Sequence, residues 1–434
     1  YQGMQNMYPT SISQIIEAVT KMIFGLGFSG GVMYLTQREY SLHATVLGRS
    51  YPSPEQAQAV IAQLASGAAV LGVSLSTAAG LVYLMLRWRK KGDGVSQQQL
   101  MHAPKPQDSS ILLKRILVIA IPVCLGSLAV NLSGIIDLLT VTGRLSHVMD
   151  TAPQQLLACY GQNIPQAELV NGTVHNYLYG AYSGKAVVIA NLVPALTTGM
   201  AVSALPAVAE SFARGNRLRT QKSIQMVLRI TALFCVPAGL GISALSQEVC
   251  SLFFGMNNEV MIGAPLLRVL GLASIFIALT GTTNSLLQAV GRVSLPVKLI
   301  LIGSAIKLAM NYLLVGIPQL NIQAAPWSTL VCYVVITLLS LIALRSTVGP
   351  LGAFGVFGKP LLAGLLCAAF ARLTQNMLMQ VTASRFAVLL SAAVGAAVYL
   401  VGLLLLRALK KEDIMMLPKG EKMAKILEKY SLLG

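Results

Sequence analysis

Two lysines within otherwise apolar stretches are the first residues whose type and position suggest chemistry. Lys307 follows Pro296 by eleven residues, and Lys21 follows Pro9 by twelve. If each proline opens a helix, each lysine lies about 16–18 Å along it, which is near the middle of a bilayer core. A lysine at that depth costs about 2.5–3.5 kcal/mol on insertion scales and by default indicates function.

Each of these lysines has a polar neighbour one helical turn away. Asn311 lies four residues after Lys307 and shares its helix face, and Glu17 lies four residues before Lys21 and can pair with it. The functional interpretation places both lysines on opposing walls of one cavity. The alternative is structural: Glu17 and Lys21 form an internal ion pair, and Lys307 pairs with another group to hold helices together.

Two more charged residues have a functional and a structural interpretation. Lys185 ends the pattern Gly180-x-x-x-Gly184-Lys185, which resembles a phosphate-binding loop but is one residue short and continues with Ala186 instead of Ser or Thr. It is otherwise an interfacial lysine whose ammonium extends toward water. Asp137, late in its apolar run, is either an ion- or proton-coupling carboxylate or a residue at the external interface.

Composition excludes several classes of protein. Of the 434 residues, 55% are hydrophobic and only 11% are charged, whereas soluble domains carry about 25% charged residues. An ordinary soluble enzyme, a disordered chain and a nucleic-acid binder are therefore excluded. No metal-ligand spacing and no set of acid, base and nucleophile falls at one membrane face, so we expect no enzyme activity, no metal and no cofactor.

Long runs with few charges predict the membrane-spanning helices. A bilayer core requires about 20 apolar residues in a helix. The sequence predicts an all-α integral membrane protein with ten transmembrane helices, because the run 308–344 completes one span and supplies a second. The runs are 12–35, 56–86, 116–143, 186–209, 229–247, 269–291, 308–344, 354–379 and 386–406.

The basic residues predict the orientation. Most of the 32 Lys and Arg residues fall in alternate loops, and few fall in the loops between them. By the positive-inside rule the basic segments are cytoplasmic, as are both ends of the chain, and the net charge of +17 needs no nucleic-acid partner. These segments are 87–115, 210–222, 292–298, 345–359 and 407–434.

Two polar segments and a weak repeat complete the organisation. Residues 91–110 predict a cytoplasmic linker, and residues 410–434 predict an amphipathic tail helix on the membrane surface. The stretches from Gln2 to Lys21 and from Gln288 to Lys307 match in outline, six helices apart. Repeats of six helices are found in transporters whose two halves rock about a central site.

Three stretches resemble a known family. They are Gln2-Gly3-Met4-Gln5-Asn6-Met7-Tyr8-Pro9 continuing to Glu17, Tyr179-Gly180-Ala181-Tyr182-Ser183-Gly184-Lys185-Ala186, and Leu287-Gln288-Ala289-Val290-Gly291-Arg292 with Pro296, Lys307 and Asn311. Together they resemble the stage V sporulation protein B family. That family is grouped with the MurJ-like lipid II and polysaccharide flippases in the multidrug/oligosaccharidyl-lipid/polysaccharide exporter superfamily.

The resemblance implies a fold of 14 helices with two six-helix lobes, of which helices 5–14 are present here. We therefore expect four N-terminal helices to be missing, together with the arginines that the family carries on its first two. Lys185 is the basic residue nearest to the arginine that lipid II flippases carry on helix eight. The implied parts are 1–90, the last two helices of the first lobe; 91–110, the linker; 111–346, the second lobe; 347–409, two additional helices forming a groove for a lipid tail; and 410–434, the tail.

The resemblance also implies a flippase in the bacterial plasma membrane. Its substrate would be an undecaprenyl-pyrophosphate-linked sugar, and its other partners membrane lipids and a monovalent cation or proton; we expect a monomer. A cationic cavity suits a pyrophosphate. Two alternatives stay open: a cation-coupled multidrug exporter, and a scaffold without transport activity in spore-cortex or envelope assembly. The expected substrate-binding residues are Lys307, Lys21, Lys185, Asn311 and Glu17, with Asp137 as the ion-coupling residue.

Overall fold

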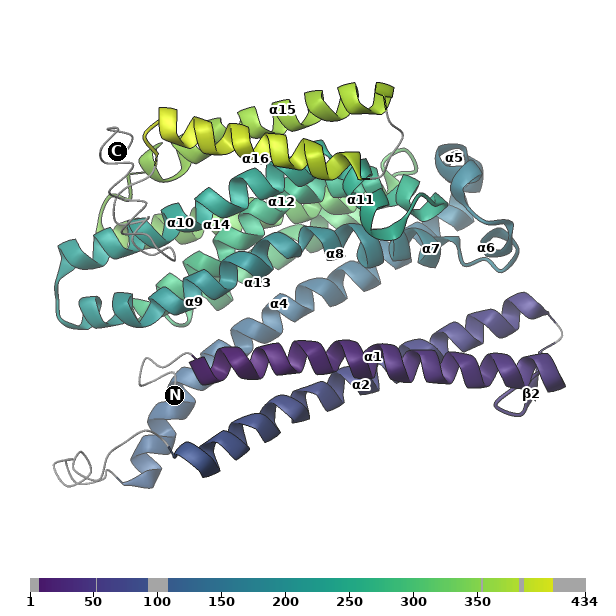
Figure 1. The fold of residues 1–434 in the computed structure, drawn as a ribbon, viewed down its shortest axis with the longest axis horizontal. Coiled ribbons are helices and arrows are strands. Elements are labelled where there is room, and N and C mark those ends of the chain that lie inside the picture. The colour runs from purple at the N-terminus through teal and green to yellow at the C-terminus, as the bar shows by residue number, and fades with distance from the viewer. Residues whose placement is uncertain (1–7, 52, 93–107, 353, 382–385, 409–434) are drawn as a thin grey trace. The chain divides into compact units, whose positions relative to one another are not determined.

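The chain forms two compact units, residues 1–108 and 109–434 (Figure 1). The division falls at the end of the predicted linker, most of which lies outside the described residues, as does the whole predicted tail helix 410–434. The structure is a computed structural model that describes residues 8–51, 53–92, 108–352, 354–381 and 386–408.

The first unit is a pair of long antiparallel helices. Helix α1, Tyr8–His43, and helix α2, Pro54–Lys91, are joined by a two-stranded hairpin. The hairpin strands are β1, Thr45–Val46, and β2, Arg49–Ser50. Prolines stand in the first turn of both helices, where their missing N–H is not needed.

Close contact and a carboxylate hold this unit together. A Cβ atom at Gly72 would lie 2.6 Å from the backbone carbonyl of Phe24, so glycine is needed where α2 crosses α1. At the hairpin, the carboxylate of Glu39 accepts hydrogen bonds from the backbone N–H groups of Leu47 (3.1 Å) and Gly48 (2.9 Å). These bonds fix a turn in which both residues have positive φ.

The second unit contains the remaining helices. Its π-helical segments η3, η4 and η6 interrupt or precede longer helices. The elements are α4 Ser109–Thr151, α5 Pro153–Tyr160, η2 Gly161–Asn163, α6 Gln166–Val170, α7 Val174–Gly180, η3 Ala181–Ala186, α8 Val187–Ala190, α9 Leu192–Ala213, α10 Arg217–Ala244, α11 Ser246–Phe254, α12 Asn258–Ala289, α13 Leu295–Met310, η4 Asn311–Val315, η5 Asn321–Gln323, α14 Ala324–Val348, η6 Phe354–Gly358, α15 Lys359–Val381 and α16 Ala387–Leu405.

Helix α12 lies at the centre of the second unit and packs against α9, α10, α11 and α14. Leu266, Leu267 and Leu270 on α12 are almost fully buried, and they belong to the largest apolar cluster. A helix that is apolar on all sides and surrounded by other helices is typical of the interior of a membrane bundle. The apolar contacts of α12 with these helices form the core of the second unit.

The last two helices, α15 and α16, form a hairpin that packs on α10 and α11 (Figure 1). Arg372 on α15 forms an ion pair of 2.7 Å with Glu248 on α11. The hydroxyl of Tyr399 on α16 donates to the backbone carbonyl of Leu233 on α10 at 2.8 Å. An ion pair on α15 and a hydrogen bond on α16 therefore connect both helices of the hairpin to the rest of the second unit.

Eight helices in the described part of the chain are long and apolar enough to cross a membrane. They overlap eight of the ten predicted spans, which confirms the all-α membrane fold. The other two predicted spans, 116–143 and 186–209, fall within the helical segments α4 and η3–α9.

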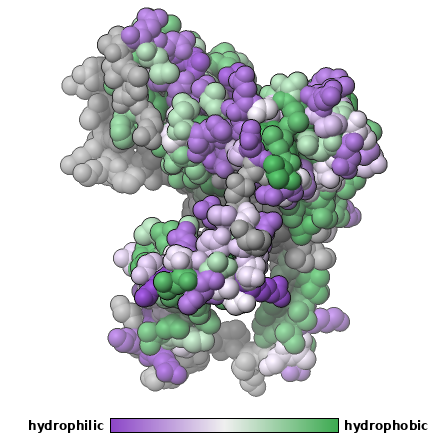
Figure 2. Space-filling view, turned by 90° about the vertical axis from the view of Figure 1, so that its right-hand side faces the viewer, coloured by the Kyte–Doolittle hydropathy of each residue, from purple (hydrophilic) through white to green (hydrophobic). Residues whose placement is uncertain are grey.

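Short helices gather at one end of the second unit, where the sequence predicted only external loops. The segments 144–170 and 248–260 contain α5, α6 and α11 there. Figure 2 is the view from this side of the picture, and it shows hydrophilic residues interspersed with hydrophobic ones. Such a mixed surface is suited to a region where helices leave a bilayer and meet water.

Candidate functional site

Lys307 and Asp137 form a buried ion pair inside the second unit. The ammonium of Lys307 on α13 lies 2.6 Å from Oδ2 of Asp137 on α4. The two residues are only 3% and 7% exposed. Nζ of Lys307 also donates to the hydroxyl of Ser133 at 3.3 Å, one turn before Asp137. Lys307, near the middle of the candidate span Leu295–Val315, therefore has an anionic partner from another helix.

Asn311 completes the hydrogen bonding of the carboxylate. Its Nδ2 donates to Oδ1 of Asp137 at 2.9 Å and approaches the hydroxyl of Thr140 at 3.2 Å. Its own Oδ1 accepts from the hydroxyl of Ser328 on α14. As predicted from their spacing, Lys307 and Asn311 share one helix face, and the contact with Asp137 shows which group this face meets.

Tyr182 and Thr329 close the network on its remaining side. The hydroxyl of Tyr182 lies 3.5 Å from Oδ2 of Asp137 and 3.4 Å from the hydroxyl of Thr329. Tyr182 comes from the π-helix η3, and Asn311 opens the π-helix η4. π-Helical turns are rare and frequently occur at functional sites. Here they direct two polar side chains toward one carboxylate.

A buried pair of this kind is costly to maintain. Removing two charges from water costs several kcal/mol per ion, and the cost is repaid only when geometry and additional hydrogen bonds are good. The partners of Asp137 meet this condition, because both of its oxygens accept bonds. The network connects α4, α13 and α14 through these side chains.

A small cavity of about 160 Å³ adjoins the pair. Ser133 both lines this cavity and accepts from Lys307, and Ser304 lines it one turn before Lys307. The Oδ1 atom of Asn284 on its wall is buried without a hydrogen-bond partner in the described part of the chain. The wall of this cavity is mostly apolar, and Ser133, Ser304 and Asn284 supply polar groups to it.

Lys185 lies in a different environment. Its ammonium forms an ion pair of 2.5 Å with Glu259 and donates to Oδ1 of Asn257 at 3.1 Å. The side chain of Lys185 is 12% exposed. Asn257 caps helix α12 by accepting from the backbone N–H of Val260. Lys185 therefore joins η3 to the beginning of α12, and it is more enclosed than a lysine extended toward water.

Lys21 and Glu17 belong to the first unit. They form an ion pair with a distance of 3.9 Å, as their spacing predicted, and their side chains are 47% and 32% exposed there. Exposed pairs at this spacing contribute about 0.3–0.5 kcal/mol in water. The shared cavity of Lys21 and Lys307 stays a prediction, because the two residues lie in different units.

Several members of the network were not singled out in the sequence. Ser133 and Thr140 share one face of α4 with Asp137, which the sequence did single out, and this polar stripe at helical spacing was a signal for both of them. Tyr182 lies in one of the family-like stretches. Ser328 and Thr329 carried no signal, because hydroxyl residues occur throughout the apolar runs and only the packing of α14 brings these two to Asn311 and Tyr182.

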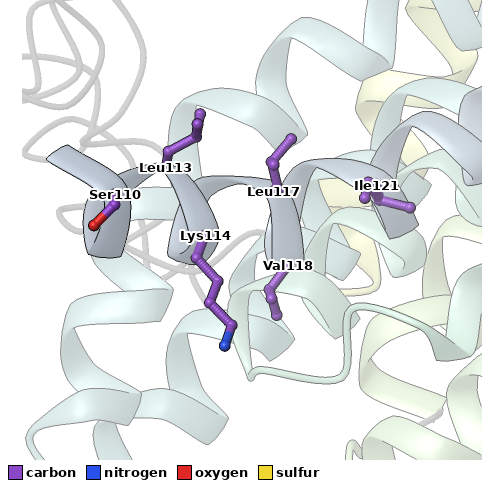
Figure 3. A pocket seen from close by; sticks show the side chains of 6 residues that line it. All are labelled: Ser110, Leu113, Lys114, Leu117, Val118 and Ile121. Carbon is purple, nitrogen blue, oxygen red and sulfur yellow. The ribbon is translucent and has the colours of Figure 1, made fainter.

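A hollow along α4 has a different character (Figure 3). It has a volume of about 520 Å³ and lies along the first turns of α4. Leu113 and Leu117 point to one side of the helix, and Lys114 and Val118 point to the other. Because one helix supplies all the lining residues and most are aliphatic, this surface is suited to contact with apolar groups and forms no polar site.

Comparison with known proteins identifies the family. The family model described as Lipid II flippase MurJ matches residues 179–401, slightly more than half of the chain. The chain belongs to the MurJ family. Membership makes it a multi-pass transporter of the lipid II flippase type in a bacterial plasma membrane, and the matched residues include Tyr182, Lys307, Asn311 and Ser328.

Individual MurJ-like proteins are similar at low sequence identity. The Lipid II flippase MurJ of Bacillus subtilis (strain 168) is 23% identical over 421 residues, covering 92% of this chain and 67% of that protein. The Uncharacterized membrane protein YabM of the same organism is 23% identical over 443 residues, covering 100% of this chain and 73% of that protein. A solved structure of Lipid II flippase MurJ in an inward closed conformation is 14% identical with a TM-score of 0.44, covering 90% of this chain and 83% of that one.

Proposed function

We propose that this protein moves an undecaprenyl-pyrophosphate-linked cell-wall precursor, lipid II or a close analogue, from the inner to the outer leaflet by alternating access. The observation that carries the proposal is the MurJ family match over residues 179–401. The polar network supports it, since a MurJ-like transporter needs charge inside its bundle to handle a pyrophosphate, and Lys307 supplies a cation there.

The ion pair suggests how Lys307 would be made available. In the described conformation its ammonium is engaged by Asp137. A pyrophosphate offers a stronger anionic partner, and a proton or monovalent cation at Asp137 would remove the competitor. We infer that Asp137 is the coupling residue and that Lys307, supported by Asn311, exchanges between Asp137 and the substrate.

The other expected residues take more peripheral roles in this proposal. Lys21 would face the substrate from the first unit, with Glu17 orienting its side chain. Lys185 would attract anionic groups at the external end, while Glu259 limits how far it moves. Residues 1–90 would complete a first lobe, 111–346 would form the second lobe, and the hairpin within 347–409 would guide the lipid tail.

The test measures exposure of lipid II at the outer leaflet of bacterial cells depleted of their own lipid II flippase. The coding sequence is expressed with any natural upstream segment included, and membrane insertion is verified. We expect exposure to be restored, and we expect restoration to be lost in Lys307→Ala. The matched control is Lys298→Ala, which removes an exposed lysine from the same helix.

Two results would contradict the proposal. Correct insertion without restored exposure would exclude lipid II as the substrate, and normal exposure in Lys307→Ala would exclude the assignment of Lys307. Because Lys307→Ala leaves Asp137 without its cation, the amount of folded protein in the membrane is measured in parallel. Asp137→Asn is included as well, since it keeps the shape of the side chain and removes the charge that competes for Lys307.

A further inference from the structure

The cavity beside the Lys307 network lies where five helices meet. Its volume is about 160 Å³, and its lining residues come from α4, α9, α12, α13 and α14. Several of these residues are only 2% to 7% exposed, so much of the cavity lies inside the helix bundle. The buried lining residues are Ser133, Thr280, Ile300, Ser304, Cys332 and Ile336.

Apolar side chains make up most of the wall. They include Ile277 on α12, Ile300 on α13 and Ile336 on α14. A water molecule inside a protein needs about two to four polar partners, whereas an apolar molecule gains by burying its surface. An engineered cavity of about 150 Å³ with aliphatic and aromatic walls binds benzene. The size and the wall of this cavity therefore favour an apolar occupant with about the volume of one aromatic ring.

The polar groups on the wall differ in whether they already have partners. The hydroxyl of Ser133 accepts from Nζ of Lys307 at 3.3 Å. The hydroxyl of Thr280 lies 3.0 Å from the hydroxyl of Thr337, within hydrogen-bond distance. In contrast, Oδ1 of Asn284 is buried and has no hydrogen-bond partner among the described residues. A buried acceptor without a donor is costly, so an occupant with one donor group would be stabilised here.

An aromatic ring with one hydroxyl group meets both requirements. The ring buries apolar surface, and the hydroxyl donates to an amide oxygen. Ligand sites in proteins commonly combine a mostly apolar wall with a few polar groups that fix the orientation of the ligand. Gly281, Asn284 and Tyr333 on the wall are half-buried, so a ligand can enter from their side. The unpaired oxygen of Asn284 is then within the part of the cavity that the ligand reaches first.

We propose that this cavity binds a small aromatic alcohol with the size and chemistry of phenol, whose hydroxyl donates to Oδ1 of Asn284. The ring would pack against Ile277, Ile300 and Ile336. The occupant would fill the space between α12, α13 and α14 next to the ion pair, and it would stabilise the described conformation of these helices by mass action. Binding in this cavity does not depend on which molecule the protein transports.

The test compares two ligands that differ in the donor group. The first is para-fluorophenol, and the second is para-difluorobenzene, which has the same ring and nearly the same size but no hydroxyl. Fluorine NMR measures the binding of each to the purified full chain in detergent micelles, and empty micelles serve as the blank. We expect both to bind, and we expect the phenol to bind about three- to tenfold more tightly, because it gains one hydrogen bond.

Two variants and a control locate the ligand. Asn284→Leu keeps the approximate size of the side chain and removes the acceptor, so it should abolish the preference for the phenol while difluorobenzene still binds. Ile277→Trp places a larger side chain in the cavity and should weaken the binding of both ligands about tenfold or more. Asn258→Leu removes an exposed asparagine from the same helix and should change either affinity less than about twofold.

The amount of folded protein is measured for each variant, and if one of the two cavity variants does not fold, the other decides. Three outcomes would overturn the assignment. The first is equal binding of the ligands to empty micelles and to micelles that contain the protein. The second is a preference for the phenol that persists in Asn284→Leu, or binding that Ile277→Trp leaves unchanged, since either result would place the ligand elsewhere. The third is an equal loss in Asn258→Leu, which would indicate a general effect of substitution on α12.

Discussion

Lys307 and Asp137 form an ion pair in which both side chains are buried. Removing either residue would therefore leave the other as an unpaired buried charge. Lys307→Met leaves a buried carboxylate without its cation, which should lower the free energy of unfolding by about 3–5 kcal/mol. The double variant Asp137→Leu with Lys307→Met removes both charges and should lose less than the sum of the single losses. A double-mutant cycle from unfolding in detergent measures this coupling.

Lys298→Met is the control for this cycle, because Lys298 is exposed on the same helix. It should change the free energy of unfolding by less than about 0.5 kcal/mol, alone or with Asp137→Leu. Additive losses for Lys307 and Asp137 would mean that the two side chains do not stabilise each other, and the ion pair would then not be the anchor between α4 and α13.

Tyr160 shows the effect of burial outside the membrane spans. Its hydroxyl donates to Oδ1 of Asn321 at 2.7 Å and accepts from Nε2 of Gln323 at 3.2 Å. Burial is the main cause that raises its pKa from 10.0 to about 12. In the unfolded chain the phenol ionises near pH 10, so the stability it contributes is complete below pH 10 and is lost as the pH rises toward 12.

Tyr160→Phe should therefore lower stability at pH 8 by about 1 kcal/mol, because Asn321 loses its donor. The difference between the wild type and the variant should shrink as the pH rises from 10 to 11. Thermal unfolding in detergent at a series of pH values measures both effects. A difference that stays constant over this interval would show that Tyr160 does not hold its proton more strongly in the folded state.

Helices α10 and α12 are in close backbone contact at two glycines. A Cβ atom at Gly239 would lie 2.6 Å from the backbone carbonyl of Gly271, which is a clash with main chain that cannot move aside. Gly239→Ala should therefore destabilise the second unit by about 1–3 kcal/mol. Gly241→Ala is the matched control on the same helix, because its Cβ would meet no neighbour within 4 Å.

The control should leave stability unchanged or raise it slightly, since alanine has a higher helix propensity than glycine. Unfolding of both variants in detergent makes the comparison. Equal behaviour of the two variants would mean that backbone contact between α10 and α12 does not determine stability, and that the helices are held together by their side chains alone.

At the element level the sequence predicted the spans well and their interruptions poorly. Long apolar runs are sufficient to predict a membrane helix, so the helices containing the spans 12–35 and 386–406 were found. The π-helical turns at Ala181 and Asn311 were not predicted, because they depend on which neighbours a helix packs against. The same holds for Asp137, whose position late in its run did not show that α13 buries it.

On the scale of the whole molecule, the sequence indicated a family and a location but left the partners of each charge open. Lys307 was predicted as a membrane-buried cation, and its burial follows from the apolar residues around it. That its partner is Asp137 follows from contacts between residues 170 positions apart in the sequence. Such contacts leave no trace in local spacing, whereas the pair Glu17–Lys21, one turn apart on one helix, could be predicted directly.

Orientation in the membrane gives a prediction for the molecule as a whole. The basic loops indicate that α5 is external and that the turn between α12 and α13 is cytoplasmic. Cys159 on α5 is exposed, and Ser294 before α13 is exposed without a capping bond from its side chain.

With the other cysteines replaced by alanine, a membrane-impermeant maleimide should label Cys159 in intact cells. In a background that also lacks Cys159, Ser294→Cys should be labelled only after permeabilisation. The opposite pattern would invert the topology.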